Sequence, residues 1–99
     1  MNMQQMLIQA QKMQREMQKK QAELEAQEFT ISKGGAVTVV VKGDKSIKSV
    51  SIDKDAMDPD NKEMVEELIA LAINEAIEQI RAKEDEISSS MSGGMGGLF

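Results

Sequence analysis

The side chains that most often carry out enzymatic chemistry are largely missing from this sequence. It contains no Cys and no His, which excludes disulfides, zinc sites of the Cys/His kind, and catalysis by a Cys or His nucleophile. Asp and Glu are therefore the only candidate acid–base catalysts, and no convergent site can be assembled around them. The sequence predicts a protein that is not an enzyme, and that needs neither a cofactor nor a small-molecule substrate.

Two short patterns are similar to ligand-binding motifs but lack essential parts of them. Gly34-Gly35 leads into a strand and has no Lys-Ser/Thr ending, so it predicts a turn and not a phosphate-binding loop. Four nearby carboxylates could attract a divalent cation: Asp53, Asp55, Asp58 and Asp60. Their spacing lacks the Gly and the terminal Glu of a calcium loop. We therefore expect helix capping and a solvated loop there, and no metal site.

Basic residues near the N-terminus form a more informative pattern. Lys12, Arg15 and Lys19 stand at i, i+3 and i+7, which places them on one side of a helix, and Lys20 is adjacent. One interpretation is a solvated face on which acidic neighbours one turn away pair with these bases. The other is a ridge that contacts phosphates and that dimer symmetry doubles. No aromatic residue is interleaved, which argues against stacking on single strands and against base-specific recognition.

The net charge of −5 is unevenly spread along the chain. Residues 1–26 hold four basic and three acidic side chains, a net charge of +1, and residues 27–55 hold five and four, also +1. Residues 56–87 hold three basic and ten acidic side chains, a net charge of −7. An anionic partner should therefore avoid the C-terminal third and contact another part of the chain.

A chain of 99 residues is one domain at most. It has two Phe, no Trp and no Tyr, so nine Met together with Val and Ile must fill the core. Met specifies a unique core poorly, and a second copy would supply more buried surface, so we expect a homodimer. Residues 1–20 are too polar for a secretory signal, and no apolar run approaches the roughly 20 residues that span a bilayer. These features predict a cytoplasmic protein without membrane contact.

Residues 2–26 predict a long amphipathic helix. Its apolar positions recur with the 3-4-3-4 spacing of a heptad seam, which Lys20 interrupts. The seam positions are Met3, Met6, Ala10, Met13, Met17, Lys20 and Leu24. About 25 residues at ~1.5 Å each give a rod of roughly 37 Å. Because this is long for so small a domain, we expect part of the helix to project beyond the rest of the fold.

Three segments with alternating apolar residues predict an antiparallel meander: residues 28–32, 36–42 and 47–52. An odd-numbered loop at residues 33–35 and an even-numbered loop around Asp44-Lys45 both gather the apolar side chains on one face. The expected cross-strand pairs are Ile31 with Val37, Phe29 with Val39, Val39 with Val50, and Val37 with Ile52. Three strands with open edges are marginal alone, and they favour pairing or a covering helix.

Residues 59–87 predict a second long helix. Asp58-Pro59 offers an N-cap followed by Pro at the first helical position, and a broad apolar stripe could cover the sheet and still contact another helix. Residues 88–97 (SSSMSGGMGG) are of low complexity and predict disorder. The sequence thus predicts an α+β fold with a single domain over residues 1–87 and a Ser/Gly/Met tail over residues 88–99.

The ordered combination of these segments resembles the YbaB/EbfC family of bacterial nucleoid-associated proteins. The resemblance begins with a Met/Gln/Lys-rich first helix and a Gly-Gly turn before a valine strand that ends in Gly (GGAVTVVVKG). It continues with a strand closing on Ile-Asp (SIKSVSID), an acidic-start helix (DNKEMVEELIALAINEAIEQI) and the Ser/Met/Gly tail. It covers almost the whole chain, roughly residues 3–97.

The resemblance implies an α-β-β-β-α fold, a homodimer joined through the sheets, and long helices that project like tweezers. It also implies binding of double-stranded DNA in the cytoplasm, at the nucleoid, with little sequence specificity. The projecting helices of the family are implicated in DNA contact. The residues of this sequence that correspond to such contacts are Lys12, Arg15, Lys19, Lys20, Arg81 and Lys83.

The sequence therefore predicts a nucleoid-associated homodimer that binds duplex DNA through phosphate contacts, without chemistry. A second hypothesis is a protein–protein adaptor near recombination or replication machinery, in which the heptad seam or the acidic helix docks a partner. A salt titration separates the two, because phosphate binding weakens steeply with salt and apolar docking barely responds. A third hypothesis, an enzyme with a carboxylate-bound metal, lacks a convergent set of residues.

Overall fold

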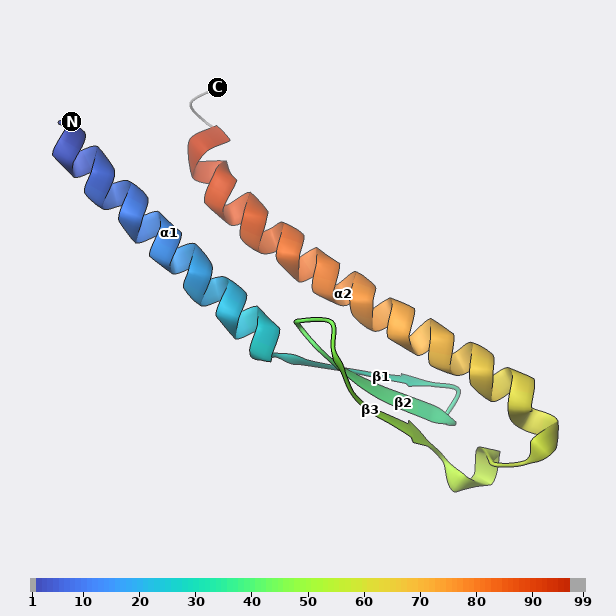
Figure 1. Cartoon of the computed structure of the whole chain (residues 1–99). Coiled ribbons are helices and arrows are strands. Elements are labelled where there is room, and N and C mark those ends of the chain that lie inside the picture. Colours follow the sequence, from blue (N-terminus) through green and yellow to red (C-terminus); the bar gives the residue numbers. More distant parts are fainter. Residues whose placement is uncertain (1, 97–99) are drawn as a thin grey trace.

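The computed structural model describes the backbone of residues 2–96 and the side chains of residues 2–89. The chain forms helix α1 (Met3–Ala26), strands β1 (Glu28–Lys33), β2 (Val37–Lys42) and β3 (Ile47–Ile52), and helix α2 (Lys62–Gly96). Two short 3-10 helices, η1 (Lys54–Ala56) and η2 (Pro59–Asn61), connect β3 to α2. The predicted α-β-β-β-α order is confirmed, with the three strands in one antiparallel sheet (Figure 1).

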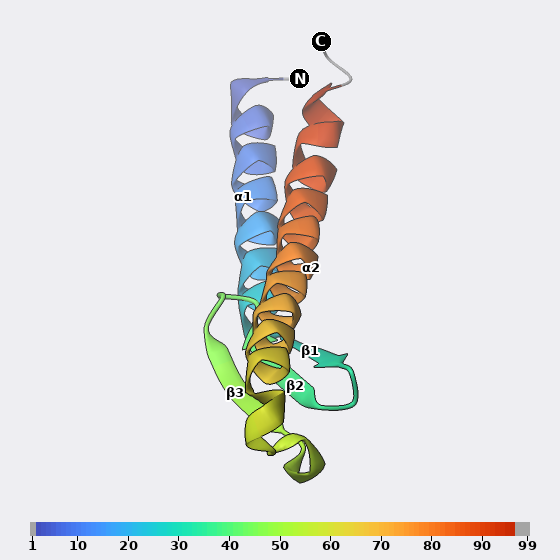
Figure 2. The same cartoon turned by 90° about the vertical axis from the view of Figure 1, so that its right-hand side faces the viewer.

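The molecule is elongated, with principal extents of 69 × 24 × 14 Å. The first half of α2 lies on the sheet, and its second half runs beside α1, away from the sheet (Figure 1). Figure 2 shows the same two helices side by side from another direction, with the start of α1 and the end of α2 at the same remote end. The expected projection of the first helix is therefore present. Within residues 2–96, neither helix is long and apolar enough to cross a membrane.

Helix α1 has a defined cap at each end. The Asn2 side chain accepts a hydrogen bond from the Gln5 backbone N–H at 2.8 Å, and the helix stops where Gln27 adopts extended backbone. Between these residues there is no Gly or Pro to interrupt the helix. Along the predicted seam, Leu24 is buried and Met13 and Met17 are half-buried. The seam therefore packs on the rest of the protein over its C-terminal half.

The first hairpin has the predicted apolar face but a different register. Its observed pairs include Phe29 with Val41, Ile31 with Val39, and Lys33 with Val37. The predicted pairing is thus wrong by two residues, because the odd-numbered loop is Gly34-Gly35-Ala36 and not residues 33–35. Both glycines have positive φ, and the Ala36 N–H closes the turn on the Lys33 carbonyl at 3.1 Å. A shift of two residues leaves each side chain on its expected face.

The second hairpin has the predicted pairs, Val39 with Val50 and Val37 with Ile52, but its register shifts between Val40 and Val41, so that Val41 lies opposite Ile47. Its four-residue loop spans residues 43–46, and Lys45 has a φ of 71°. Asp44 accepts hydrogen bonds from the hydroxyl and the backbone N–H of Ser46. These two bonds, the hydroxyl first, hold the pKa of Asp44 below its usual value. The loop is therefore ordered by local polar contacts.

The core lies between one face of the sheet and α2. The fully buried side chains of β2 (Val37, Val39 and Val41) point toward α2, where the small side chains of Ala72 and Ala76 permit close approach. The remaining buried apolar residues are Leu24, Phe29, Ile31, Ala36, Ala56 and Ile80. α2 packs on β1 and β2 far more than on β3. The broad apolar stripe predicted for the second helix thus covers two of the three strands.

Helix α2 differs from the prediction at both ends. Its first predicted turn is the separate 3-10 helix η2, with Asp58 as N-cap and Pro59 at the first position. At the other end the helix continues to Gly96, so residues 88–96 are helical where disorder was predicted. Extending a formed helix by one residue costs little, since each residue adds a hydrogen bond. That residues 88–99 form a tail outside the domain stays a prediction, because residues 97–99 lie outside the described residues.

The turn after β2 makes backbone contact with the end of α1. The Gly43 N–H donates a hydrogen bond to the Gln27 carbonyl at 2.9 Å. A Cβ on Gly43 would stand 1.7 Å from the carbonyl oxygen of Leu24, which is far too close for two atoms that are not bonded to each other. Glycine is therefore required at position 43 so that α1 can leave the sheet in its observed direction.

We expect Gly43→Ala to lower the free energy of unfolding by about 2–3 kcal/mol, since the new methyl group forces the backbone of α1 to move. Urea denaturation measures this change. Gly35→Asn is the control, because nothing lies within 4 Å of a Cβ there and Asn accepts a positive φ; it should cost less than about 1 kcal/mol. Equal stability of Gly43→Ala and the parent would contradict this account of the backbone contact between Gly43 and the end of α1, here called the joint.

Candidate nucleic-acid interface

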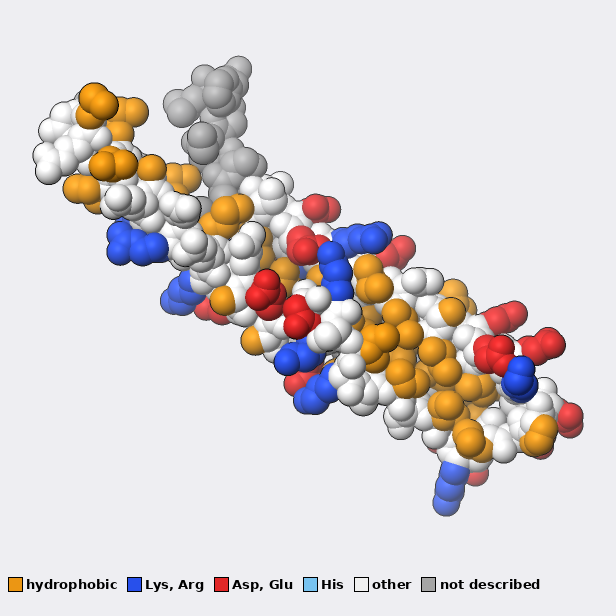
Figure 3. Space-filling view, in the orientation of Figure 1, with side chains coloured by type: hydrophobic (Ala, Val, Ile, Leu, Met, Phe, Trp, Pro, Cys, Tyr) orange, Lys and Arg blue, Asp and Glu red, His pale blue; other side chains and the backbone are white. Residues whose placement is uncertain are grey.

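Three of the predicted basic residues lie on the outer face of α1: Lys12, Arg15 and Lys19, here called the basic ridge. At 3.6 residues per turn they fall within about 60° of one another around the helix, and about 160° from the seam that faces α2. All three are exposed. Figure 3 shows Lys and Arg side chains along the edge of α1 that is turned away from α2. The structure thus brings these three residues together on one accessible surface.

The side chains of the basic ridge form no ion pair with the other described residues. None of the ion pairs among the described side chains involves Lys12, Arg15 or Lys19. Arg15 makes a long hydrogen bond, 3.5 Å from its Nε to the Gln11 carbonyl, which leaves its other donors available. The solvated-face interpretation rests on pairing with acids one turn away, and none of the ion pairs found among the described side chains joins such an acid to Lys12, Arg15 or Lys19. The ridge therefore presents three cations to an anionic partner.

Lys20 and Lys83 occupy a different place, the groove between α1 and α2. Both line a hollow of about 200 Å³, together with Glu23, Leu24, Gln27 and Ile87. Lys83 Nζ lies 3.4 Å from Glu86 Oε2. The structure brings these two lysines from distant parts of the sequence to one groove. This groove lies between the helices, whereas the ridge lies on the outer face of α1.

Arg81 belongs to neither group. It follows the buried Ile80 on α2 and is exposed, and its position is rotated about 100° around the helix from that core residue. The six predicted residues thus form an outer ridge of three, a pair in the groove, and a separate arginine. The ridge is the group that combines exposure, shared direction and the absence of acidic partners among the described residues.

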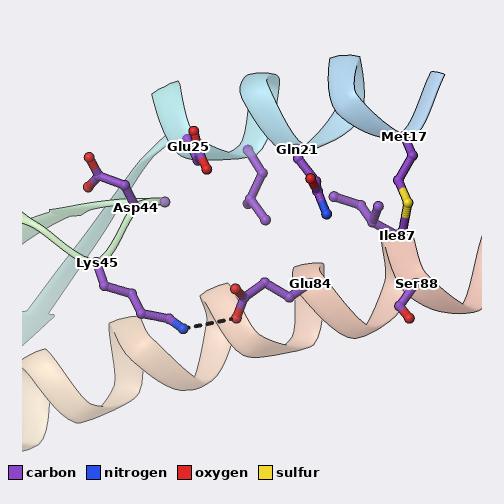
Figure 4. Close-up of a pocket in the computed structure, with 10 residues that line it drawn as sticks. Met17, Gln21, Glu25, Asp44, Lys45, Glu84, Ile87 and Ser88 are labelled. Atoms are coloured by element: carbon purple, nitrogen blue, oxygen red, sulfur yellow. Dashed lines mark ion pairs between the residues drawn. The ribbon is translucent and has the colours of Figure 1, made fainter. Parts of the chain in front are cut away.

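A larger hollow, of about 380 Å³, lies where α1, the loop after β2 and α2 meet (Figure 4). Met17 and Ile87 form apolar parts of its wall, and the ion pair of Lys45 with Glu84, at 3.3 Å, connects the loop to α2 across it. Three carboxylates line it against one lysine. This excess of negative charge disfavours a phosphate ligand, so we interpret the hollow as part of the joint that holds α1.

The acidic loop before α2 has the capping role predicted for it. Asp53 accepts a hydrogen bond from the Asp55 N–H at 2.8 Å, and Asp58 accepts one from the Asp60 N–H at 2.9 Å. These two carboxylates begin η1 and η2. Among the residues that the structure describes, no group of three or more acidic side chains could hold a metal ion.

One exposed surface was missed by the sequence analysis. Apolar side chains that are 45% to 68% exposed lie on β3, in the connection after it, and on α2. They are Ile47, Val50, Met57, Met64 and Leu71, here called the apolar patch. Hydrophobic atoms gather over the sheet and the first half of α2 in Figure 3. The available signal was geometric, since a helix about 10 Å wide cannot cover three strands that are about 4.8 Å apart.

Comparison with known proteins places the chain in a family. Residues 1–95 match the YbaB/EbfC DNA-binding family. The chain belongs to this family. A nucleoid-associated protein of Clostridium novyi (strain NT) is 46% identical over 99 residues, which cover 99% of this chain and 84% of the relative. A nucleoid-associated protein of Chloroflexus aurantiacus (strain J-10-fl) is 41% identical over 101 residues, which cover 100% of both chains.

Membership of the YbaB/EbfC family confirms the resemblance predicted from the sequence. The match extends over both long helices and the sheet, so it includes the ridge, the groove and the apolar patch. The family is one of DNA-binding proteins and not of enzymes, which agrees with the lack of Cys and His in the chain.

The exposed position of the ridge leads to a prediction about stability. Changing Lys12, Arg15 and Lys19 together to Gln should alter the free energy of unfolding by no more than about 0.5 kcal/mol per site, because exposed side chains without partners contribute little. Thermal unfolding followed by circular dichroism measures this. Leu24→Ala, at the buried end of the same helix, serves as the contrast and should cost about 2–5 kcal/mol. A large loss in the triple variant would mean that the ridge supports the fold.

Proposed function

We propose that the protein is a nucleoid-associated protein of the cytoplasm that binds double-stranded DNA as a homodimer, with little sequence specificity. The basic ridge carries this proposal. Lys12, Arg15 and Lys19 span about 11 Å along an exposed helix face and make no ion pair among the described residues. The family match and the names of the relatives support the same function.

Charge separation allows an acidic chain to bind a polyanion. Glu84, Asp85 and Glu86, on the half of α2 that runs beside α1, lie behind α1 when DNA approaches the ridge, so the thickness of a helix, about 10 Å, separates them from the phosphates. The other acidic residues of α2 lie farther away, on the half that covers the sheet (Figure 1). The Debye length is about 8 Å at physiological ionic strength. Much of the repulsion from α2 is therefore screened, whereas the cations of the ridge can touch phosphates directly. Such contacts fix the position of a protein on DNA but carry no sequence information.

The other predicted basic residues have lesser roles in this proposal. Lys20 and Lys83 face the groove between the helices, where acidic neighbours offset part of their charge. Arg81 is exposed on α2, in the most acidic part of the chain. We expect all three to add to the field around the arms, with direct phosphate contacts coming from the ridge.

The apolar patch supports dimerisation through the sheet. Val50 and Ile47 belong to the same sheet face as the buried valines of β2, yet both are about half exposed because α2 does not cover β3. β3 is also an edge strand with unpaired backbone groups. A second copy placed on this surface would bury both features. It would also give the dimer two projecting arms and two ridges.

A salt titration of DNA binding tests the function. With about four phosphate contacts per dimer, log K should fall with log salt at a slope near −3 to −4. Changing Lys12, Arg15 and Lys19 to Gln should flatten this slope and weaken binding to every duplex sequence alike. Fluorescence anisotropy on mixed-sequence duplexes measures both quantities.

The matched control carries the same change in net charge at the other end of the molecule. Lys33, Lys48 and Lys54 changed to Gln should leave the slope near that of the parent, because these residues lie on or next to the sheet. Their exposed ion pairs contribute little to stability. If both triple variants bind DNA as the parent does, the ridge is only a solvated face. If the parent shows no salt-dependent binding, the adaptor hypothesis takes the place of DNA binding.

The proposed homodimer leads to a separate prediction. Light scattering of the parent should give about twice its 10.9 kDa chain mass, and Val50→Glu or Leu71→Glu should reduce this toward the monomer, because a carboxylate in the apolar patch would be buried unpaired. Ser49→Glu is the control, since it places the same charge on the opposite face of β3. Dissociation by Ser49→Glu alone would assign the interface to the other face of the sheet.

A further inference from the structure

A second cluster of exposed apolar side chains lies at the far end of α1. Met3, Met6, Leu7 and Ile8, here called the apolar tip, are 87%, 56%, 60% and 57% exposed. Figure 3 shows hydrophobic atoms grouped at that end of the helix. The tip lies at the opposite end of the elongated molecule from the apolar patch on the sheet (Figure 1). The proposed dimer, joined through the sheet, therefore does not use the tip.

The charges around the apolar tip favour an anionic occupant. Residues 2–11 contain no charged side chain, and the first acidic residue of the chain is Glu16. The two charged residues that precede it, Lys12 and Arg15, are both basic. Exposed amides accompany the apolar side chains at Gln4, Gln5, Gln9 and Gln11. This end of α1 can thus approach a polyanion without repulsion, and it offers hydrogen-bond donors and acceptors beside its apolar groups.

One residue of the tip, Ile8, shares a helix face with the basic ridge, whereas Met3 and Met6 belong to the seam on the opposite side of α1. Ile8, Lys12, Arg15 and Lys19 follow a 4-3-4 spacing, so they lie in one row on the outer side of α1. Ile8 is about 6 Å along the helix axis from Lys12. A duplex whose phosphates contact the ridge therefore also meets Ile8. On this face of α1 the row that begins with Ile8 continues as cations, which favours a polyanion over an apolar partner.

We propose that Ile8 and its neighbour Leu7, both in the apolar tip, enter the minor groove of duplex DNA and partly unstack a base step, which bends the duplex. This inference rests on the proposed function and assigns a role to residues outside the ridge. The helix, about 10–12 Å wide, exceeds a minor groove of about 6 Å, so the side chains enter and the groove widens around them. Leu, Ile and Met are among the side chains that act as such wedges, and Gln is among those that contact the minor groove.

The experiment uses the full chain and a duplex that carries 2-aminopurine at a central TA step, which is easily unstacked. Binding of the parent should raise the 2-aminopurine fluorescence, and end-labelled duplex should show increased energy transfer as it bends. Leu7→Gln/Ile8→Gln should bind with the salt slope of the parent but lose both signals. Gln has good helix propensity and both positions are exposed, so circular dichroism should show an unchanged fold.

Lys12→Gln is the complementary variant. It removes a charge from the same row of side chains and leaves Leu7 and Ile8 unchanged. It should lower the salt slope by about 1, while each bound complex keeps the fluorescence and the bend of the parent. This contrast separates the contribution of the ridge from that of the tip.

Each remaining outcome overturns the inference. A parent that binds with a normal salt slope but gives no fluorescence rise has no wedge, although the proposed function stands. A Leu7→Gln/Ile8→Gln variant that keeps both signals places the unstacking elsewhere. A change in its mass by light scattering would identify the tip as a surface for self-association. A parent without salt-dependent DNA binding defeats the proposed function together with the wedge.

Discussion

The contact between Gly43 and the last turn of α1 determines the direction of α1, and with it the position of the basic ridge and the apolar tip. α1 has one buried residue, Leu24, and otherwise only half-buried or exposed side chains, so its packing alone fixes its direction weakly. The hydrogen bond from Gly43 to Gln27, and the close approach of Gly43 to the Leu24 carbonyl, set that direction through the backbone. The ridge and the tip depend on this joint, because both stand on the part of α1 beyond it.

The distribution of charge gives the molecule a preferred side for an anion. α2 and the loop before it carry a net charge of −7 over residues 56–87, whereas the outer face of α1 is basic and its first nine residues, 3–11, carry no charge. The acidic helix therefore disfavours approach of DNA from behind and leaves the outer side of the arm as the accessible direction. In this way a chain with an overall charge of −5 remains compatible with DNA binding.

Features set by local periodicity could be predicted from the sequence: the order of the elements, the projecting first helix, the second hairpin and the shared face of Lys12, Arg15 and Lys19. The first hairpin was two residues out of register, because alternation identifies a face but not which residues form a glycine turn. The end of α2 was missed because propagation of a formed helix outweighs a run of Ser and Gly. The exposed β3 and the role of Gly43 depend on tertiary geometry, and no local pattern encodes them.

The joint at Gly43 also gives α1 the mechanics of a lever. A helix of 24 residues is about 36 Å long, so a rotation of about 10° at its base displaces its far end by about 6 Å, close to the width of a minor groove. Substitutions at residues 24–27 or 43 can therefore change the span between the two arms of the proposed dimer while every residue of the basic ridge and the apolar tip stays the same. The distance between the arms and the chemistry of their surface can therefore be changed independently.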